Sequence, residues 1–394
     1  MMKARIKNHF QFILLFLLIT IGVSFASETT DVWSRLYNQA KTYEQRYETM
    51  LNIAELEDRD LAPFLSTALN DLILTWKNPV NSNQLTLHNQ LMELIVEQLG
   101  SLKARDSADY LFTVVKDTED PFLKRAALIA LGKVGGTAYA DEIAMLLRNL
   151  NFKPGKASQA EEVVAYGCIT ALERFKEPIG YEPVFFASIG WYTDRIKSKA
   201  RIALEIILAD PSEVLGDIIK NNSIFKVKLQ ALNQEDRSNA PAEKKIEVAT
   251  TALDQGLINV GRDVTEKQIL QNLRVKAIEM LTLLKFDSIR AISLMEEMLH
   301  KDYDVNGKLS TIQALGSCPK TEAAEALINF LAELNHGQEI GLPDKDNRIV
   351  ISTIRALGNT KNKLAHPQLL RVKFAGYGSE VVREAGEALI KLNK

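Results

Sequence analysis

The sequence predicts an all-α protein, a right-handed α-solenoid of stacked helical hairpins, and three observations carry this prediction. An alanine-rich stretch at residues 120–136 contains Ala-Leu-Gly, and the same three residues return at 314–316 and 356–358. Self-similarity at a period of a few tens of residues is typical of repeat proteins. Around these motifs apolar residues recur at intervals of three and four, which is the period of a helix. No alternating run of β-branched residues is long enough to indicate a sheet.

The leucine of each motif sets the register of the repeat. Leu99 and Leu131 are 32 residues apart, and several other intervals are 32 to 34 residues. Each unit is expected to hold a first helix before this leucine and a second helix after it, as at residues 139–150. We expect the next glycine, as in Gly132 and Gly316, to end the first helix because glycine tolerates the left-handed cap conformation. The anchor leucines are Leu99, Leu131, Leu172, Leu204, Leu232, Leu281, Leu315, Leu357 and Leu389.

Residues 1–26 have the layout of a secretory signal peptide. Three basic residues lie within the first seven positions, and an almost wholly apolar run follows at residues 10–23. Small residues then occupy the −3 and −1 positions of a cleavage site. The apolar run is shorter than the roughly 20 residues that a spanning helix needs. We expect a mature chain that begins at Ser27 and is exported to the periplasm. An uncleaved N-terminal anchor is the alternative, and the lack of a cysteine near residue 26 disfavours a lipoprotein.

Residues 27–80 are expected to form an N-terminal helical capping pair, and residues 81–394 the repeat array. An apolar face that runs from Trp33 to Ala54 predicts one long helix, and a second helix is expected at about residues 61–76. The opposite face of the first helix is charged, as the outer surface of a terminal repeat has to be. The last copy of the repeat is expected to cap the other end.

Charge and cysteine content narrow the class of protein. Cleavage would remove three of the 48 Lys and Arg residues and none of the 50 Asp and Glu residues, which leaves a net charge of −5. A mildly acidic chain with no cluster of five or more basic residues lacks the electrostatic footprint of a nucleic-acid-binding protein. Cys168 and Cys318 lie in different repeats. Since stacked repeats contact only their neighbours, we expect two buried free thiols and no disulfide.

The motif at residues 120–135 combines an Asp, an Arg and then Ala-Ala-x-x-Ala-Leu-Gly-x-Val-Gly. In this pattern the chain resembles the HEAT-repeat family, in the form called PBS-lyase HEAT-like repeats. The resemblance covers about residues 85–394; the copies at 308–316 and 348–358 match in part, and four other copies are degenerate. The residues that match best are Asp120, Arg125, Ala126, Ala127, Ala130, Leu131, Gly132, Val134 and Gly135.

The resemblance also implies an internal ladder, in which the Asp of a repeat pairs with a basic residue at the inner edge. On this sequence it implies structural rather than catalytic roles for three pairs. These pairs are Asp120 with Arg125, Asp194 with Lys199, and Asp346 with Arg348.

Three intervals between anchor leucines are longer, and their extra residues fall at 151–159, 256–265 and 335–346. Each segment is expected to be a turn between a second helix and the next first helix. Insertions on one face of a solenoid often mark a binding face, and loops often carry function. We therefore expect these enlarged turns to flank a concave binding surface; tolerated surface insertions are the alternative. Their candidate interface residues are Phe152, Lys153, His336 and Leu342.

Two further segments stand out in composition. The most aromatic stretch, residues 181–192, adds Trp191 and Tyr192 to the candidate interface, because exposed Trp and Tyr dominate interface energetics. The alternative is that these rings form core between repeats. The polar segment at residues 233–243 predicts a mobile turn within one repeat.

No constellation of residues predicts catalysis. The histidines beyond the signal segment lie far apart, and neither they nor the cysteines have the spacing of a zinc site. There is no Gly-x-Ser-x-Gly motif, and the glycines at residues 132–136 lack the Gly-Lys-Ser/Thr of a phosphate loop. We expect no catalytic residue, no metal site and no cofactor, although a site assembled across repeats would escape a linear search.

We therefore expect a non-catalytic, monomeric scaffold or adaptor of the periplasm or cell envelope, which binds another protein and no nucleic acid. Two alternatives stay open. One is a chaperone-like or lyase-type factor, which the resemblance suggests and the signal peptide argues against. The other is a structural envelope component tethered to the membrane through an uncleaved N-terminal segment.

Overall fold

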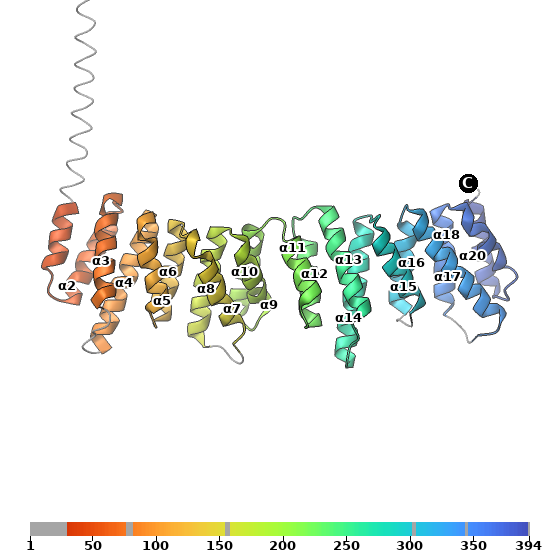
Figure 1. Cartoon of the computed structure of the whole chain (residues 1–394), viewed down its shortest axis with the longest axis horizontal. Helices are drawn as coiled ribbons and strands as arrows, with labels where there is room; N and C mark the ends of the chain where they lie inside the picture. The colour runs from red at the N-terminus through yellow and green to blue at the C-terminus, as the bar shows by residue number, and fades with distance from the viewer. Residues whose placement is uncertain (1–29, 76–81, 154–157, 302–304, 343–345, 393–394) are drawn as a thin grey trace, which may run out of the picture. The chain divides into compact units, whose positions relative to one another are not determined.

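The computed structural model describes residues 30–75, 82–153, 158–301, 305–342 and 346–392 (Figure 1). Within these ranges every regular element is an α-helix or a short 3₁₀ helix, and the chain is an all-α solenoid of successive helices. The predicted signal peptide lies outside the described residues. No described helix combines the length and the apolar character that a membrane span requires.

The chain divides into two compact units, residues 1–208 and 209–394, a boundary that the sequence did not indicate. The first unit begins with a helical stretch at residues 30–39. Its further α-helices are α2 (Tyr43–Glu55), α3 (Ala62–Thr75), α4 (Ser82–Leu102), α5 (Ala108–Asp117), α6 (Pro121–Val134), α7 (Ala140–Asn151), α8 (Gln159–Phe175), α9 (Tyr181–Ile189) and α10 (Asp194–Ile207).

The second unit continues the alternation of helices. Its α-helices are α11 (Ser212–Asn221), α12 (Phe225–Arg237), α13 (Ala242–Ile258), α14 (Val264–Leu283), α15 (Ile289–His300), α16 (Val305–Ser317), α17 (Thr321–Glu339), α18 (Asn347–Thr360), α19 (His366–Arg371) and α20 (Ser379–Leu392).

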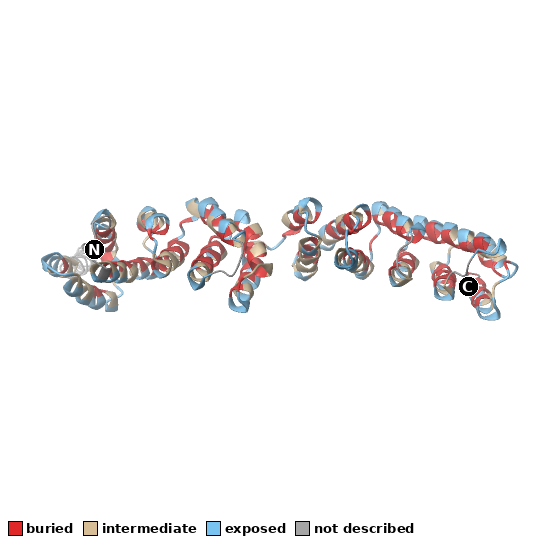
Figure 2. Ribbon diagram, turned by 90° about the horizontal axis from the view of Figure 1, so that it is seen from below, coloured by how far each residue is buried: buried red, intermediate tan, exposed pale blue. Residues whose placement is uncertain are grey.

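Within each unit the helices form two layers. In the first unit α4, α6, α8 and α10 pack in succession, and α7 packs on α9. In the second unit the even-numbered helices α12, α14, α16, α18 and α20 pack in succession. The odd-numbered helices α11, α13, α15, α17 and α19 do the same. We call these the even layer and the odd layer. Figure 2 shows that the buried residues lie on helix faces turned toward neighbouring helices.

The predicted register of the repeat is confirmed. All nine anchor leucines lie in even-numbered helices, from Leu99 in α4 to Leu389 in α20. None is more than 8% exposed, and seven of them are fully buried at 0%. The leucine therefore marks the position at which each even helix faces the core of its unit.

The prediction that the motif glycine ends its helix is wrong. Helix α6 runs through Gly132 to Val134, and the left-handed cap is Gly135, with φ of 83°. Gly132 is instead buried against the next even helix, where an added Cβ would lie 3.1 Å from the Cα of Ala171. Such a contact is tighter than most Cβ atoms make, so this glycine allows the two helices to approach each other closely.

This glycine–alanine contact recurs between consecutive even helices. An added Cβ would lie 2.9 to 3.1 Å from the Cα of an alanine in the next even helix. In every case that alanine directly precedes the next anchor leucine. The contacts join Gly100 with Ala130, Gly132 with Ala171, Gly316 with Ala356, and Gly358 with Ala388.

Several predicted boundaries also differ. The long helix expected from Trp33 to Ala54 is interrupted: one helical stretch ends at residue 39 and α2 begins at Tyr43, where the Thr42 hydroxyl accepts a hydrogen bond from the Gln45 N–H. The segment at 233–243 is mostly helical, since α12 continues to Arg237 and α13 begins at Ala242. Its polar residues within α12 are partly or fully buried, except for the exposed Arg237.

Candidate binding groove

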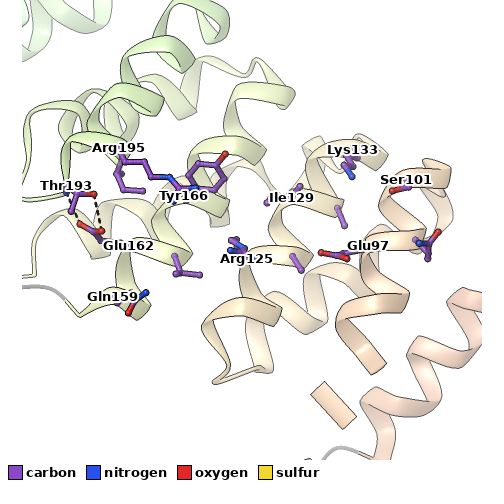
Figure 3. A pocket seen from close by; sticks show the side chains of 15 residues that line it. Glu97, Ser101, Arg125, Ile129, Lys133, Gln159, Glu162, Tyr166, Thr193 and Arg195 are labelled. Atoms are coloured by element: carbon purple, nitrogen blue, oxygen red, sulfur yellow. Dashed lines mark hydrogen bonds between the residues drawn. The ribbon is translucent and has the colours of Figure 1, made fainter. Parts of the chain in front are cut away.

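A groove of about 520 Å³ lies on the even layer of the first unit (Figure 3). Residues of four successive even helices, α4, α6, α8 and α10, together with Thr193 before α10, line it. The surface is hollow here because the motif places small residues side by side. Ala126 and Ala130 of α6 lie in its lining, and Ala130 is the alanine against which Gly100 of α4 packs.

Aliphatic side chains and one guanidinium group occupy the middle of the groove. Ile129 and Val163 are partly exposed there, and Arg125 of α6 projects between Glu97 and Glu162 (Figure 3). The Arg125 guanidinium lies 5.5 Å from the centre of the Phe122 ring, which precedes it by about one helical turn.

The carboxylate partner of Arg125 is a glutamate of the preceding even helix. Arg125 Nη2 lies 3.9 Å from Glu93 Oε1, which is a loose ion pair. Burial raises the pKa of the Glu93 carboxyl above its ordinary value, and the neighbouring Glu97 adds to this effect while Arg125 opposes it. Of these groups Glu97 and Arg125 line the groove, and Glu93 lies beside it.

The start of α10 forms the other end of the groove. The Thr193 backbone N–H and hydroxyl donate hydrogen bonds of 2.8 and 3.1 Å to the Glu162 carboxylate (Figure 3). The Arg195 guanidinium lies 5.7 Å from the centre of the Tyr166 ring of α8. A cation over an aromatic face is stabilised by the ring quadrupole, so Tyr166 helps to hold the Arg195 guanidinium in place.

The second unit has a related groove of about 580 Å³ between α16 and α18. Gly316 and Ala356, one of the recurring glycine–alanine contacts, lie in its lining. Its one arginine, Arg355, is engaged, because its guanidinium makes two hydrogen bonds of 2.7 and 2.9 Å with Glu384 of α20. The same repeat motif thus produces a groove in each unit, with different polar groups.

The structure distributes the predicted ladder residues differently from the expected pairs. Asp120 caps α6 by accepting hydrogen bonds from the N–H groups of Phe122 and Leu123, whereas Arg125 has Glu93 as its partner. Lys199 pairs with Glu173 of α8, and Asp194 is the first residue of α10.

Only the third expected pair forms an ion pair. Arg348 holds both carboxylate oxygens of Asp346 at 2.5 to 3.0 Å. Arg125 and Lys199 instead form ion pairs with glutamates of the preceding even helix, Glu93 and Glu173. That these groups act in structure rather than catalysis stays a prediction.

The aromatic candidates are divided between core and surface. Tyr192 is 1% exposed, and its hydroxyl donates a 3.0 Å hydrogen bond to Asn151 Oδ1, so its ring belongs to the core of the first unit. Trp191 is half-buried, and its Nε1–H donates to the Leu150 carbonyl at 3.2 Å. Tyr192 is thereby removed from the candidate interface. Phe152, by contrast, is 74% exposed.

Two of the three enlarged turns, at 256–265 and 335–346, are shorter than expected because helices extend into them. Helix α13 continues to Ile258, and α17 continues to Glu339. His336 is therefore an exposed helical residue, while Leu342, 53% exposed, lies in the turn. Lys153 forms an ion pair of 2.5 Å with Glu161 across the turn before α8.

Potential metal ligands are dispersed within the part of the chain that the structure describes. No group of three or more His, Cys, Asp and Glu side chains there is arranged to hold a metal ion. Cys168 and Cys318 are both free and buried, as predicted. Burial raises the pKa of the Cys168 thiol to about 12, which keeps it protonated and unreactive.

No protein-family model and no curated protein sequence matches this chain. Solved structures with a similar succession of helices include an engineered protein, with 13% identity and a TM-score of 0.34 over 92% of this chain and 99% of that one. The TSC2 N-terminus has 13% identity and a TM-score of 0.36 over 93% and 100%. Human deoxyhypusine hydroxylase in complex with glycerol has 15% identity and a TM-score of 0.29 over 87% and 99%.

The groove residues Lys133, Tyr166 and Arg195 were not singled out from the sequence. The register of the repeat does mark the position of Lys133, which follows the motif alanine Ala130 by three residues. The Lys133 side chain lies over Gly100, and its Cδ would be 3.3 Å from a Cβ added to Gly100. Arg174 relates to Gly132 in the same way. A basic residue three positions after the motif alanine therefore lies beside the contact between even helices.

Proposed function

We propose that the chain is a non-catalytic scaffold that binds another protein through the groove on the even layer of its first unit. One observation carries this proposal: four successive even helices contribute to a single hollow that combines aliphatic side chains with charged and amide groups. Protein interfaces combine an apolar centre with a polar rim in the same way. The chain is an α-solenoid repeat scaffold, and such folds offer extended surfaces for binding.

The proposal places this scaffold outside the cytoplasm, in the periplasm or cell envelope, as a monomer without a cofactor. The support for export is the arrangement of basic, apolar and small residues in the first 26 positions. Sequencing the N-terminus of the protein purified from cells tests this part. A chain that begins at Ser27 supports export, and a chain that keeps its first 26 residues contradicts cleavage.

The binding role can be tested with a matched pair of substitutions. Ile129→Glu places a charge in the middle of the groove, and Met145→Glu places the same charge on α7 of the odd layer, where Met145 is 52% exposed. Proteins cross-linked to each variant in intact cells are then identified by mass spectrometry. We expect Ile129→Glu to lose the partners that the wild-type chain captures and Met145→Glu to keep them.

Circular dichroism melting of both variants provides the control for folding. If Ile129→Glu melts like Met145→Glu and still captures the same partners, the groove is not the binding surface.

A further inference from the structure

We infer that the groove of the first unit receives an acidic peptide segment with aliphatic side chains. This inference rests on the proposed function, since it names the chemistry of the partner at the same site.

Two cations at the groove have no acidic partner. Among the described residues, no carboxylate lies within 4.0 Å of the Lys133 ammonium or the Arg195 guanidinium, although both residues line the groove. Arg125 adds a third positive charge whose partner, Glu93, lies 3.9 Å away. That distance is long beside the 2.5 to 2.8 Å of the tighter pairs in this unit.

The negative charges of the groove are fewer and less available. Glu162 already accepts two hydrogen bonds from Thr193, which stabilise its charge locally. Glu97 lies on α4, at the end of the groove opposite Arg195 (Figure 3). Lys133 lies at that same end (Figure 3), so each end of the groove holds one cation without an ion-pair partner among the described residues, Lys133 at α4 and Arg195 at α10. A bound segment would place its carboxylates toward Lys133 and Arg195.

The floor of the groove fits aliphatic rather than large aromatic side chains. Ile129 and Val163 present branched side chains there, and Ala126 and Ala130 leave shallow hollows between them. Burial of a leucine- or valine-sized side chain against such a floor removes apolar surface from water on both partners.

Polar side chains suited to a peptide backbone surround this floor. Gln98, Ser101 and Gln159 all line the groove, and their amide and hydroxyl groups can both donate and accept hydrogen bonds. A peptide bond presents one N–H and one C=O per residue, so these groups match a peptide segment. The acidic balance of the whole chain, 48 basic against 50 acidic residues, disfavours a nucleic acid as the ligand that supplies the negative charge.

The groove of the second unit lacks this excess of positive charge. Its arginine, Arg355, shares the Glu384 carboxylate with Arg383, at 2.7 to 2.9 Å. Its other lining groups are neutral: Gln313, Ser317, Ser352 and Asn359 beside small and aliphatic residues. Binding of an acidic peptide segment is thus assigned to the groove of the first unit alone.

A selection from a random peptide library tests the inference directly. The full-length mature chain is immobilised, and unstructured peptides of about twelve residues are selected for binding to it. We expect the selected pool to be enriched in Asp and Glu next to Leu, Ile and Val. A pool that is enriched in Lys and Arg, or one without a charge bias, overturns the inference.

Substitutions then assign the selected peptides to the groove. A fluorescent copy of one selected peptide should bind the Lys133→Ala, Arg195→Ala double variant at least tenfold more weakly than the wild-type chain. Arg201→Ala is the matched control, because Arg201 is an exposed arginine of the same helix as Arg195 but does not line the groove. An equal loss of affinity in the control variant contradicts the assignment.

The outcomes separate this inference from the proposed function. Loss of cross-linked partners in Ile129→Glu together with a pool that lacks acidic bias keeps the groove as the binding surface and rejects an acidic partner. Retention of partners in Ile129→Glu rejects the groove itself, and the acidic segment with it.

Discussion

Gly316 of α16 lies directly against Ala356 of α18, so closely that an added Cβ would be 2.7 Å from the Cβ of Ala356. This contact is one of the recurring glycine–alanine contacts that join consecutive even helices. Where glycine follows the anchor leucine, it therefore sets the distance between helices and does not end the helix. The same contact lies in the lining of the groove of the second unit.

The first prediction concerns this contact. Gly316→Ala should destabilise the chain by about 1–3 kcal/mol, because the new methyl group forces α16 and α18 apart. Gly386→Ala is the matched control within α20, since an added Cβ at Gly386 meets nothing within 4 Å. There the higher helix propensity of alanine should stabilise the chain by about 0.5–1 kcal/mol. Chemical denaturation followed by far-UV circular dichroism measures the free energy of unfolding of both variants. Equal changes in this free energy would contradict a close contact at Gly316.

A second prediction concerns the division between core and surface in the aromatic stretch. Tyr192→Ala should destabilise the first unit by about 3–5 kcal/mol, because it removes a large buried side chain. Phe152→Ala should change stability by no more than about 0.5 kcal/mol, since Phe152 is 74% exposed.

Tryptophan fluorescence reports on this unit specifically, because the three tryptophans, Trp33, Trp76 and Trp191, all precede residue 209. A urea titration followed by fluorescence therefore compares the two variants. A small effect of Tyr192→Ala would mean that Tyr192 is available at the surface.

The third prediction follows from a carboxyl group buried in the second unit. Glu235 is 0% exposed, and its Oε1 lies 2.7 Å from the Ser212 hydroxyl oxygen, which also lies 2.6 Å from Asp210 Oδ1. Ser212 has one hydroxyl proton for these two acceptors, so one contact requires a protonated acid. Burial raises the pKa of Glu235, Asp210 adds to the rise, and Lys245 and the Ser212 hydrogen bond oppose it. Burial therefore favours the neutral, protonated form of the Glu235 carboxyl.

The sign of the pH dependence follows from this raised pKa. The folded chain holds the Glu235 proton more tightly than the unfolded chain does, so this contribution to stability is complete below the ordinary glutamate pKa and is lost as pH rises through the folded pKa. Glu235→Gln keeps a neutral group and removes the titration. We expect the stability of the variant relative to wild type to increase from pH 5 to pH 8.

Hydrogen exchange of peptides from α12, corrected for the intrinsic rate at each pH, measures this difference locally. If wild type and Glu235→Gln show the same pH dependence, then Glu235 does not titrate on unfolding.

A fourth prediction concerns the extended helix α17. Asn335 is 0% exposed, and its Nδ2–H donates a 3.0 Å hydrogen bond to the Gln368 carbonyl oxygen. Asn335→Ala should cost about 1–3 kcal/mol because that carbonyl loses its partner. The adjacent His336→Ala, at an exposed position of the same helix, should have almost no effect on the melting temperature. A comparable drop in both variants would show that the cost comes from the end of α17 rather than from this hydrogen bond.

The same hydrogen bond changes how the enlarged turns can be tested. Deleting residues 335–346 would remove buried Asn335 along with the exposed turn and would damage the fold. Substitution of Leu342 alone, which is 53% exposed, is the appropriate change to ask whether this turn binds a partner.

The sequence was sufficient for the class of fold and the register, because the spacing of Leu131, Leu315 and the other anchors follows directly from helix period and repeat length. The sequence predicts a helix end at Gly132, whereas the structure shows a close contact between helices, because both situations favour glycine. Only the position of Ala171 in the next even helix distinguishes them. Local sequence carries no information about that neighbour.

The groove was beyond linear analysis for a similar reason. Arg195 and Tyr166 are 29 positions apart, and their contact depends on the packing of α10 on α8. The ion-pair partners of the ladder residues also depend on the packing of neighbouring helices. Asp120 is five positions from Arg125 but is used to cap α6, which leaves Glu93 of the neighbouring helix as the partner of Arg125.

The central claim, that the groove on the even layer of the first unit binds a partner protein, is tested most directly by site-specific photocrosslinking in intact cells. A photoreactive amino acid is placed at Ser101 or Gln159, which line the groove, and in matched chains at Lys116 or Met145, which are exposed in the odd layer. The account predicts one discrete adduct from both groove positions and none from the odd layer. Adducts of equal yield from both layers, or from the odd layer alone, would contradict it.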